Sequence, residues 1–363
     1  MRRYSKRLLG IVLLWGMLLA VLCGCGAGAL PASGLENQET TIASTTVDGG
    51  TLRLSVLDVG DAAAQILQVD GKIMVIDVGD QGTEETVRRE LAALGVDKLD
   101  AVVLSHGHSD HLGGYEALTG YDIGMLFLSP QENDTEIYHE AVDTLAARSE
   151  RVLVPYPGDV IQLGGAAVQF LAPQESEYED LNDSSLVVRI TYGETSLLLP
   201  GDMEGLEADE MTAAFPDLET DLMVAAHHGS ARDQTNSYAL LRTINPAAVI
   251  ISSAGADSEY GFPHEEVLSR LADLGAAVYR TDLQGSIQVV SDGTALRING
   301  TAVSSQTAGN GLAGAAAYIG NINSRKFHTP NCANLPAEQN RVYFADRTGA
   351  VEAGYTPCGS CRP

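Results

Sequence analysis

Short apolar runs rich in β-branched residues alternate along this chain with segments whose apolar residues recur at helical spacing. Between residue 51 and about residue 300 the order is strands followed by a helix, repeated several times. We predict strands at 52–59, 64–69, 73–77, 101–104, 168–171, 186–191, 196–199, 222–225, 248–252 and 286–290. We predict helices at 84–94, 134–148, 204–214, 236–244 and 264–274. Because amphipathic helices bury their apolar faces against a sheet, we expect residues 51–300 to form an α/β domain.

The N-terminal end differs from this domain. Four basic residues among the first seven precede the apolar run 8–22, which is short for a membrane span and has the layout of a secretory signal. The run ends in Leu-Cys-Gly-Cys, which resembles a bacterial lipobox with Cys25 as the lipidated residue. We therefore predict a lipoprotein signal peptide at 1–24, a flexible tether at 25–50, and export with a lipid anchor on the outer side of a membrane. Cleavage further along, giving a secreted protein, and an uncleaved anchor are the alternatives.

The chain is strongly acidic. Its formal net charge is −26, and removal of residues 1–24 takes away four positive charges and no negative ones, which gives about −30. Most of such a surface repels a polyanion, so a broad positive face for DNA is excluded. Chemistry on a nucleic acid would have to rely on metal cations and a local basic patch.

Four metal-ligand side chains follow the apolar run 101–104. The segment Ser-His-Gly-His-Ser-Asp-His-Leu-Gly-Gly places His106, His108, Asp110 and His111 within six positions at a predicted strand end. Imidazole nitrogen and carboxylate oxygen suit zinc, manganese or iron, and four donors suffice to serve two ions. A chance cluster of surface histidines is the alternative interpretation.

Two further predicted strands end in the same kind of residue. Asp202 follows one of them and the pair His227 and His228 follows the other. A helix N-cap is the alternative role for Asp202. One histidine of the pair is expected to bind metal and the other to contact a ligand or the substrate. The predicted metal ligands are thus His106, His108, Asp110, His111 and Asp202, together with one of the pair His227 and His228.

Such a set predicts hydrolysis assisted by two divalent ions, zinc or manganese. Two cations roughly 3.5–4 Å apart hold a hydroxide at neutral pH, polarise a phosphoryl or carbonyl oxygen and stabilise the leaving oxygen. Esters, lactams and phosphodiesters are all served by this chemistry, so the ligands indicate the reaction type and leave the substrate open.

The pattern His-x-His-x-Asp-His followed by Leu-Gly-Gly resembles the opening motif of the metallo-β-lactamase superfamily. The resemblance implies a four-layered αββα sandwich. Over about residues 52–296, the order and spacing of five further segments look like the extracellular β-lactamase-like domain of ComEC competence proteins. These are Asn-Asp-Ser-Ser at 182–185, Leu-Pro-Gly-Asp at 199–202, His-His-Gly-Ser at 227–230, Gly-Phe-Pro-His at 261–264 and Arg-Thr-Asp-Leu-Gln-Gly at 280–285. That resemblance implies metal-dependent hydrolysis of DNA phosphodiesters outside the cell.

The resemblance also implies roles for individual residues. Asp110, Asp202 and His264 are the expected catalytic residues, although His264 is equally well interpreted as a helix-start residue. The expected substrate contacts are Asn182, Ser184 and Ser230. Residues 182–185 stand where related enzymes supply another histidine, and Asn182 or Asp183 is expected to substitute for it, with or without binding metal.

The sequence departs from the family pattern at two places. Asp58-Val59-Gly60-Asp61 is two residues shorter than the usual motif, and Phe262 stands where a histidine is common. We therefore interpret Asp58, Asp61 and Asp77 as structural turn residues.

The C-terminal segment predicts a second metal site. Residues 301–317 carry no charge and are expected to form a linker before a module at 318–363. His328, Cys332, Cys358 and Cys361 have the spacing H-x₃-C and C-x₂-C, which suits one structural zinc. The module resembles the zinc-binding module of the Ada DNA-repair protein, with His328 in place of its first cysteine. A disulfide is the alternative. The module is locally basic, so DNA bound outside the active site is expected here.

These observations predict a surface-anchored DNA phosphodiesterase or nuclease. One rival is a hydrolase of a small ester, lactone or cell-wall phosphodiester, which the net charge favours. A second rival is a non-catalytic surface lipoprotein that binds DNA or a partner, which the missing histidine favours. The sequence identifies no protein partner.

Overall fold

The computed structural model describes residues 50–303 and most of 318–361, with gaps at 330–331, 333, 338–339, 345–346 and 353. The predicted signal peptide, Cys25, all of the tether but its last residue, and most of the linker lie outside the described residues. Within the described part of the chain, we find no helix with the length and apolar character needed to cross a bilayer.

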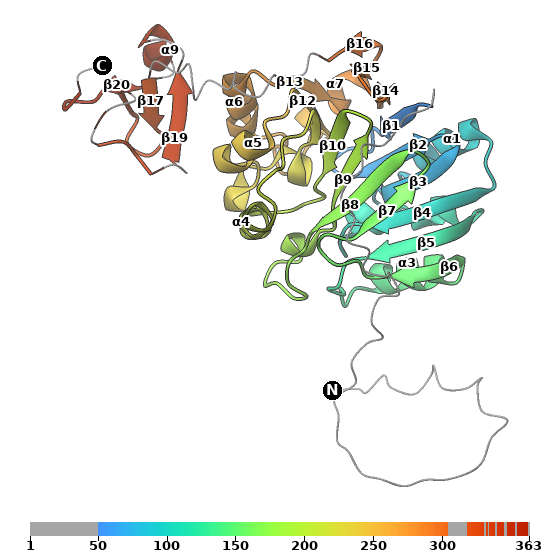
Figure 1. Ribbon diagram of the computed structural model, residues 1–363. Helices are drawn as coiled ribbons and strands as arrows, with labels where there is room; N and C mark the ends of the chain where they lie inside the picture. The colour runs from blue at the N-terminus through green and yellow to red at the C-terminus, as the bar shows by residue number, and fades with distance from the viewer. Residues whose placement is uncertain are drawn as a thin grey trace, which may run out of the picture. The chain divides into compact units, whose positions relative to one another are not determined.

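Two large mixed sheets form the main domain (Figure 1). The first has nine strands in the order β16-β15-β14-β1-β2-β3-β4-β5-β6. Its strands are β1 Leu52–Val56, β2 Ala64–Val69, β3 Lys72–Val78, β4 Lys98–Leu104, β5 Asp122–Leu128, β6 Ser149–Leu153, β14 Ile287–Ser291, β15 Leu296–Ile298 and β16 Thr301–Ala302. The second has seven strands in the order β13-β12-β11-β10-β9-β8-β7. Its strands are β7 Val160–Leu163, β8 Ala166–Ala172, β9 Val187–Tyr192, β10 Thr195–Leu199, β11 Leu222–Val224, β12 Ala248–Ile251 and β13 Ala277–Arg280.

Helices cover the outer face of each sheet, which gives four layers. The α-helices of the main domain are α1 Glu84–Leu94, α2 Ser109–Leu112, α3 Glu136–Ala146, α4 Gly205–Ala214, α5 Tyr238–Ile244, α6 Glu265–Leu274 and α7 Thr281–Gln284. The short 3-10 helices are η1 Tyr115–Leu118, η2 Asn182–Ser184, η3 Ala226–Gly229, η4 Arg232–Gln234 and η5 Gly255–Asp257. Apolar residues of α1 and α3 pack on the nine-stranded sheet, and those of α4, α5 and α6 pack on the other. The predicted αββα architecture is therefore confirmed.

The central core lies between the two sheets. It joins inward-facing residues of strands from both, among them Leu54 and Val103 on one side and Phe170 and Leu197 on the other. Each large apolar side chain that is fully buried there contributes about 1.5–3 kcal/mol to folding. This packing fixes the strands against each other, and the loops that follow them are anchored as a result.

Most of the strands that the apolar pattern missed lie at or next to a sheet edge. β6 is a sheet edge with three exposed residues among its five. β5 carries Gly124, at which an added Cβ would lie 2.6 Å from the carbonyl oxygen of Asp100 in the neighbouring strand. The absence of a side chain therefore serves close strand packing, although glycine reads as a strand breaker in sequence.

The C-terminal module has its own four-stranded sheet, in the order β19-β17-β18-β20. Its elements are β17 Tyr318–Asn321, β18 Lys326–His328, β19 Arg341–Phe344, α9 Arg347–Glu352 and β20 Thr356–Pro357. Its buried apolar residues include Ile319, Phe327, Val342, Phe344, Ala350 and Tyr355. A core of this size gives little stability by itself, so a bound metal would add to it.

Candidate metal centre

Three strand ends bring the predicted ligands together. The loop after β4 leads into α2, which carries Asp110 and His111, while Asp202 follows β10 and His228 lies in η3 after β11. One ligand atom from each of these four residues lies within 4.8 Å of all the others. The sequence predicted this convergence.

The donor set fits a metal cation. His111 Nε2 lies 3.0 Å from Asp202 Oδ1, and His228 Nε2 lies 3.3 Å from Asp110 Oδ2 and 3.7 Å from Asp202 Oδ2. His111 Nε2 is fully buried, yet it has no hydrogen bond of acceptable geometry to any described group. A buried imidazole nitrogen without a hydrogen bond, facing two carboxylates, is the environment of a metal ligand.

Buried groups behind the cluster orient both imidazoles. Asp77 Oδ2 lies 2.8 Å from His111 Nδ1, and the same carboxylate accepts hydrogen bonds from the amide and the hydroxyl of Ser105. The carbonyl oxygen of Ser252 lies 3.2 Å from His228 Nδ1. With Nδ1 engaged in this way, each ring presents Nε2 to the cluster.

The interpretation of Asp77 as a turn residue is therefore wrong. It lies in β3, is 1% exposed, and its carboxylate contacts the ring of a predicted ligand, His111. Asp61 does behave as a structural residue, since its carboxylate accepts a hydrogen bond from the Ala254 amide. The structural role of Asp58 stays a prediction, because only its backbone amide is engaged, as a donor to Ser286 Oγ.

Carboxylates and imidazoles of the cluster shift the pKa of one another. Burial alone would raise the pKa of Asp202, but His111 and His228 outweigh this effect and hold it well below its usual range. Burial alone would lower the pKa of His111, but Asp202 and Asp77 outweigh it and raise that pKa. The cluster thus stabilises positive charge at its centre, as a cation site must.

His106 and His108 lie beside this cluster and form a pair. His106 Nε2 lies 3.0 Å from His108 Nδ1, and the His106 ring centroid lies 4.2 Å from that of His111. Burial lowers the pKa of His106 well below its usual range, which keeps the imidazole neutral and able to donate its lone pair. Ser185 Oγ lies 3.4 Å from His106 Nδ1, in the segment where related enzymes were expected to supply a histidine.

The adjacent residues His227 and His228 differ in where their side chains lie. His228 is 4% exposed and joins the four-residue cluster, whereas His227 lies outside it. His227 Nδ1 lies 3.2 Å from Glu204 Oε1, and its Nε2 lies 3.7 Å from Asp202 Oδ2. Both histidines have positive φ angles, of 47° and 53°, and this unusual backbone turns consecutive side chains toward the same region.

Two of the predicted substrate contacts are buried in the structure. Ser184 and Ser230 are both fully buried; the Ser184 hydroxyl donates to the carbonyl of Leu181, and Ser230 Oγ accepts from the amide of Arg232. Ser184 ends a 3-10 helix and Ser230 directly follows another, and both hydroxyls form hydrogen bonds with nearby backbone there.

Asn182 and Asp183 do not enter the metal cluster either. Asn182 Nδ2 donates to Glu204 Oε1, so it orients the carboxylate that lies beside His227. Asp183 Oδ1 accepts from the amide of Glu207 at the start of α4. These contacts and the position of Glu204 depend on a distant pairing of segments, which the sequence does not reveal.

His264 occupies the N-cap position of α6, as the alternative interpretation holds. Its Nδ1 accepts a hydrogen bond from the Ala231 amide at 2.8 Å. The ring is partly exposed and packs against Phe262, whose ring contacts those of His227 and His228. Its Nε2 therefore carries the proton in the neutral ring and remains available to a ligand.

The interior side of the cluster is closed. A cavity of about 20 Å³ behind it is bordered by Gln65, Asp77 and His228, among others, and is too small for a substrate. A substrate must therefore approach from the solvent side, where the Asp110 side chain is 29% exposed.

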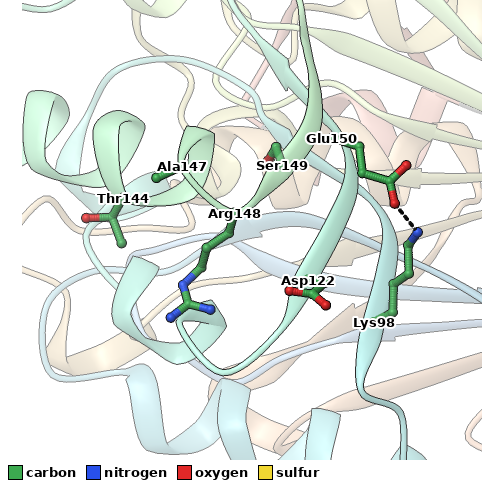
Figure 2. Close-up of a pocket in the computed structure, with 7 residues that line it drawn as sticks. All are labelled: Lys98, Asp122, Thr144, Ala147, Arg148, Ser149 and Glu150. Atoms are coloured by element: carbon green, nitrogen blue, oxygen red, sulfur yellow. Dashed lines mark hydrogen bonds and ion pairs between the residues drawn. The ribbon is translucent and has the colours of Figure 1, made fainter. Parts of the chain in front are cut away.

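A wider hollow lies at the opposite ends of the parallel strands. It measures about 700 Å³ and occurs where β4, β5 and β6 begin, whereas the metal ligands follow strand ends. Figure 2 shows its lining residues, Lys98, Asp122, Thr144, Ala147, Arg148, Ser149 and Glu150. Lys98 pairs with Glu150 at 2.6 Å, and the charges are balanced overall. None of these residues belongs to the described metal-ligand clusters.

The C-terminal module contains the second cluster. His328, Cys332, Cys358 and Cys361 present ligand atoms within 4.8 Å of one another, with His328 Nδ1 at 3.3 Å from Cys332 Sγ. The three cysteines are free thiols, which contradicts the disulfide alternative. One nitrogen and three sulfur donors in a closed group fit a structural zinc.

A sequence model of the metallo-beta-lactamase superfamily matches residues 58–253, and one of the metal binding domain of Ada matches 307–363. The chain therefore belongs to the metallo-β-lactamase superfamily, is a metal-dependent hydrolase of that superfamily, and carries an Ada-like zinc-binding domain.

Among its relatives are competence proteins, which supports the ComEC-like assignment. ComE operon protein 3 of Bacillus subtilis is 33% identical over 200 residues, which cover 54% of this chain and 25% of that protein. Competence protein ComA of Neisseria gonorrhoeae is 28% identical over 237 residues, which cover 65% and 32%. The chain thus spans about a quarter to a third of the length of these relatives.

Solved structures with a similar fold include a diphosphatase from the PhnP family. It is 17% identical to this chain, the match covers 63% of this chain and 94% of the diphosphatase chain, and the TM-score is 0.41. The metallo-beta-lactamase fold protein YhfI from Bacillus subtilis is 14% identical, covers 63% and 96%, and has a TM-score of 0.44.

Proposed function

We propose that this protein is an exported, lipid-anchored phosphodiesterase that cleaves DNA with the help of two divalent cations. The observation that carries the proposal is the buried His111 Nε2, left without a hydrogen bond among Asp110, Asp202 and His228. The competence relatives make DNA the first substrate to test. The lipid anchor rests on the lipobox-like segment that ends in Cys25.

The two cations would share Asp202. One would be held by Asp110, His111, Asp202 and His228, and the other by His106 and His108 together with Asp202. Bound cations of this kind activate water and stabilise the charge that develops on a phosphodiester. Ser185 in place of a third histidine leaves the second position with fewer strong donors, so we expect its affinity for metal to be lower.

Other residues of the chain complete the centre. Asp110 and Asp202 would supply the negative charge that holds the cations. Asp77 and the carbonyl of Ser252 fix the orientation of the His111 and His228 rings. His264 has its Nδ1 fixed by the Ala231 amide, so its protonated Nε2 is suited to donate a hydrogen bond to a phosphate oxygen or to the leaving oxygen.

Each rival has one observation in its favour. The net charge of −26 favours a hydrolase of a small ester, lactone or cell-wall phosphodiester, because DNA is repelled by an acidic surface. The Ser185 position favours a non-catalytic surface protein that binds DNA or a partner, because a depleted second site is less reactive. Exposed Arg325, Lys326 and Arg347 in the C-terminal module would supply the local basic contacts for DNA.

Full-length protein in detergent, stripped of metal and reloaded with zinc or manganese, separates these functions. The proposal predicts turnover of both DNA and bis(p-nitrophenyl) phosphate. Turnover of the small phosphodiester alone would support the small-substrate enzyme. DNA binding without turnover of either substrate would support the binding protein.

A further inference from the structure

An exposed aromatic ring, that of Tyr260, lies close to the metal centre, with the ring of Phe262 between it and His228. Tyr260 is 57% exposed, and its ring stacks on Phe262 with a centroid distance of 5.5 Å and an interplanar angle of 22°. Phe262 is 3% exposed, so it forms a rigid base beneath the tyrosine.

Phe262 connects this stack to the centre. Its ring centroid lies 6.0 Å from that of His228, 5.5 Å from that of His227 and 5.2 Å from that of His264. Only one buried ring therefore separates Tyr260 from a residue of the metal cluster, and the exposed ring lies within a short reach of a phosphate bound there.

The backbone holds the tyrosine in this place. The Phe262 amide donates to Ser258 Oγ at 2.9 Å, and Gly261 has a φ of 79°, in the left-handed region that favours glycine. The turn carries Tyr260 and Phe262 on the same side. The Tyr260 hydroxyl has no hydrogen-bond partner among the described residues, so the fold does not use its polar end.

The chain segment that carries Tyr260 is acidic. Asp257, Glu259, Glu265 and Glu266 flank the ring in sequence, and segment 252–264 contains no lysine or arginine. Stacking of a base on an aromatic face does not depend on a positive surface. An exposed ring is thus the kind of contact that an acidic protein can offer to a nucleotide.

We infer that Tyr260 stacks on a nucleobase next to the phosphodiester under attack, and that this contact makes single-stranded DNA the preferred form. The preference follows because bases in a duplex are already stacked and paired, whereas an unpaired base is free to lie on the ring. The inference rests on the proposed DNA phosphodiesterase function and adds to it the form of the substrate.

The test compares Tyr260→Ala and Tyr260→Phe with the wild type on three substrates: a single-stranded oligonucleotide, the same sequence as a duplex, and bis(p-nitrophenyl) phosphate. Removal of a ring that stacks on a base weakens binding by about 5- to 150-fold. We expect Tyr260→Ala to lose that factor in kcat/KM on the single strand, to lose less on the duplex, and to keep its turnover of the small phosphodiester. Tyr260→Phe should remain close to the wild type. Tyr156→Ala is the matched control, because Tyr156 is also 57% exposed and lies after the edge strand β6.

An oligonucleotide with one abasic position beside the cleaved bond provides a second measurement. It should slow the wild type about as much as Tyr260→Ala does, and the two changes together should not add. Equal losses by Tyr260→Ala on all three substrates, or additive losses with the abasic strand, would overturn the inference while leaving DNA cleavage standing. If the metal-loaded wild type cleaved no DNA, the proposed function would fail first and the inference with it.

Discussion

Among individual residues, the candidate metal ligands can be recognised in the sequence. The residues that hydrogen-bond to these ligands and orient them cannot. The His-x-His-x-Asp-His motif and Asp202 each follow an apolar strand, so their roles could be predicted. Asp77 also ends an apolar run, but only the folded chain shows that its carboxylate lies 2.8 Å from His111 Nδ1. The choice of His228 over His227 likewise depends on backbone angles that sequence does not specify.

Replacing Asp77 by asparagine should weaken metal binding. The carboxylate fixes the orientation of the His111 ring and favours the form with Nε2 free, and loss of such a partner costs about 10–100-fold in metal affinity. Metal titration followed by calorimetry would measure the change. Asp61→Asn is the control, since Asp61 binds a backbone amide away from the cluster, and equal affinities in the two variants would contradict the assigned role of Asp77.

The two adjacent histidines should differ on substitution. His228→Ala removes a cluster ligand and should reduce the amount of tightly bound metal, because three donors remain at that position. His227→Ala should retain the metal and lower turnover instead. Elemental analysis of both variants after dialysis distinguishes them. A loss of metal in His227→Ala with full retention in His228→Ala would reverse the assignment.

Among helices and strands, the apolar periodicity predicts segments with a strong pattern, but it does not predict edge strands. The helix over 84–94 and the strand over 64–69 coincide with α1 and β2. The edge strand β6 escaped prediction because its exposed polar residues lack a buried pattern. The pairing of η2 with α4, which buries Asp183 beside Glu207, comes from long-range packing that no local pattern encodes.

That pairing creates a buried carboxyl group with a pH-dependent cost. Glu207 is 0% exposed and neither of its carboxylate oxygens has a hydrogen-bond partner among the described residues. Burial, followed by the nearby charges of Asp183 and Glu210, raises the pKa of Glu207 well above its ordinary value of 4.5. The folded state thus binds this proton more tightly than the unfolded state, so stability should fall as the pH rises above about 4.5 toward the folded-state pKa.

Glu207→Gln should therefore stabilise the protein more at pH 8 than at pH 5. The gain at pH 8 is expected to be on the order of 1–3 kcal/mol, the cost of a buried polar group without a partner. Each kcal/mol corresponds to about 2–4 °C in Tm for a domain of this size. Thermal unfolding at both pH values measures the effect, with Asp209→Asn on the exposed side of α4 as the control. A gain that is the same at both pH values would show that proton binding by Glu207 is not responsible.

At the scale of the whole molecule, two separate metal-binding units follow each other along one chain. The main domain offers carboxylate and imidazole donors suited to hydrolysis, and the C-terminal module offers one imidazole and three thiols suited to a structural zinc. Cys358→Ser should therefore lower the zinc content by one ion per chain and leave the metal content of the main domain unchanged. Unchanged total zinc in this variant would argue against the module site.

DNA cleavage that depends on the metal centre is the most direct test of the proposed function. The measurement is cleavage of end-labelled single-stranded DNA by full-length protein, first stripped of metal and then restored with zinc or manganese, beside Asp202→Ala with folding confirmed by circular dichroism. We expect no cleavage by the stripped protein, recovery on metal addition, and a loss of at least about 100-fold in Asp202→Ala, because loss of a group that only orients a metal ligand already costs about 10–100-fold. Intact DNA in the presence of a fully metal-loaded wild type, or equal cleavage by the folded Asp202→Ala variant, would contradict the proposed function.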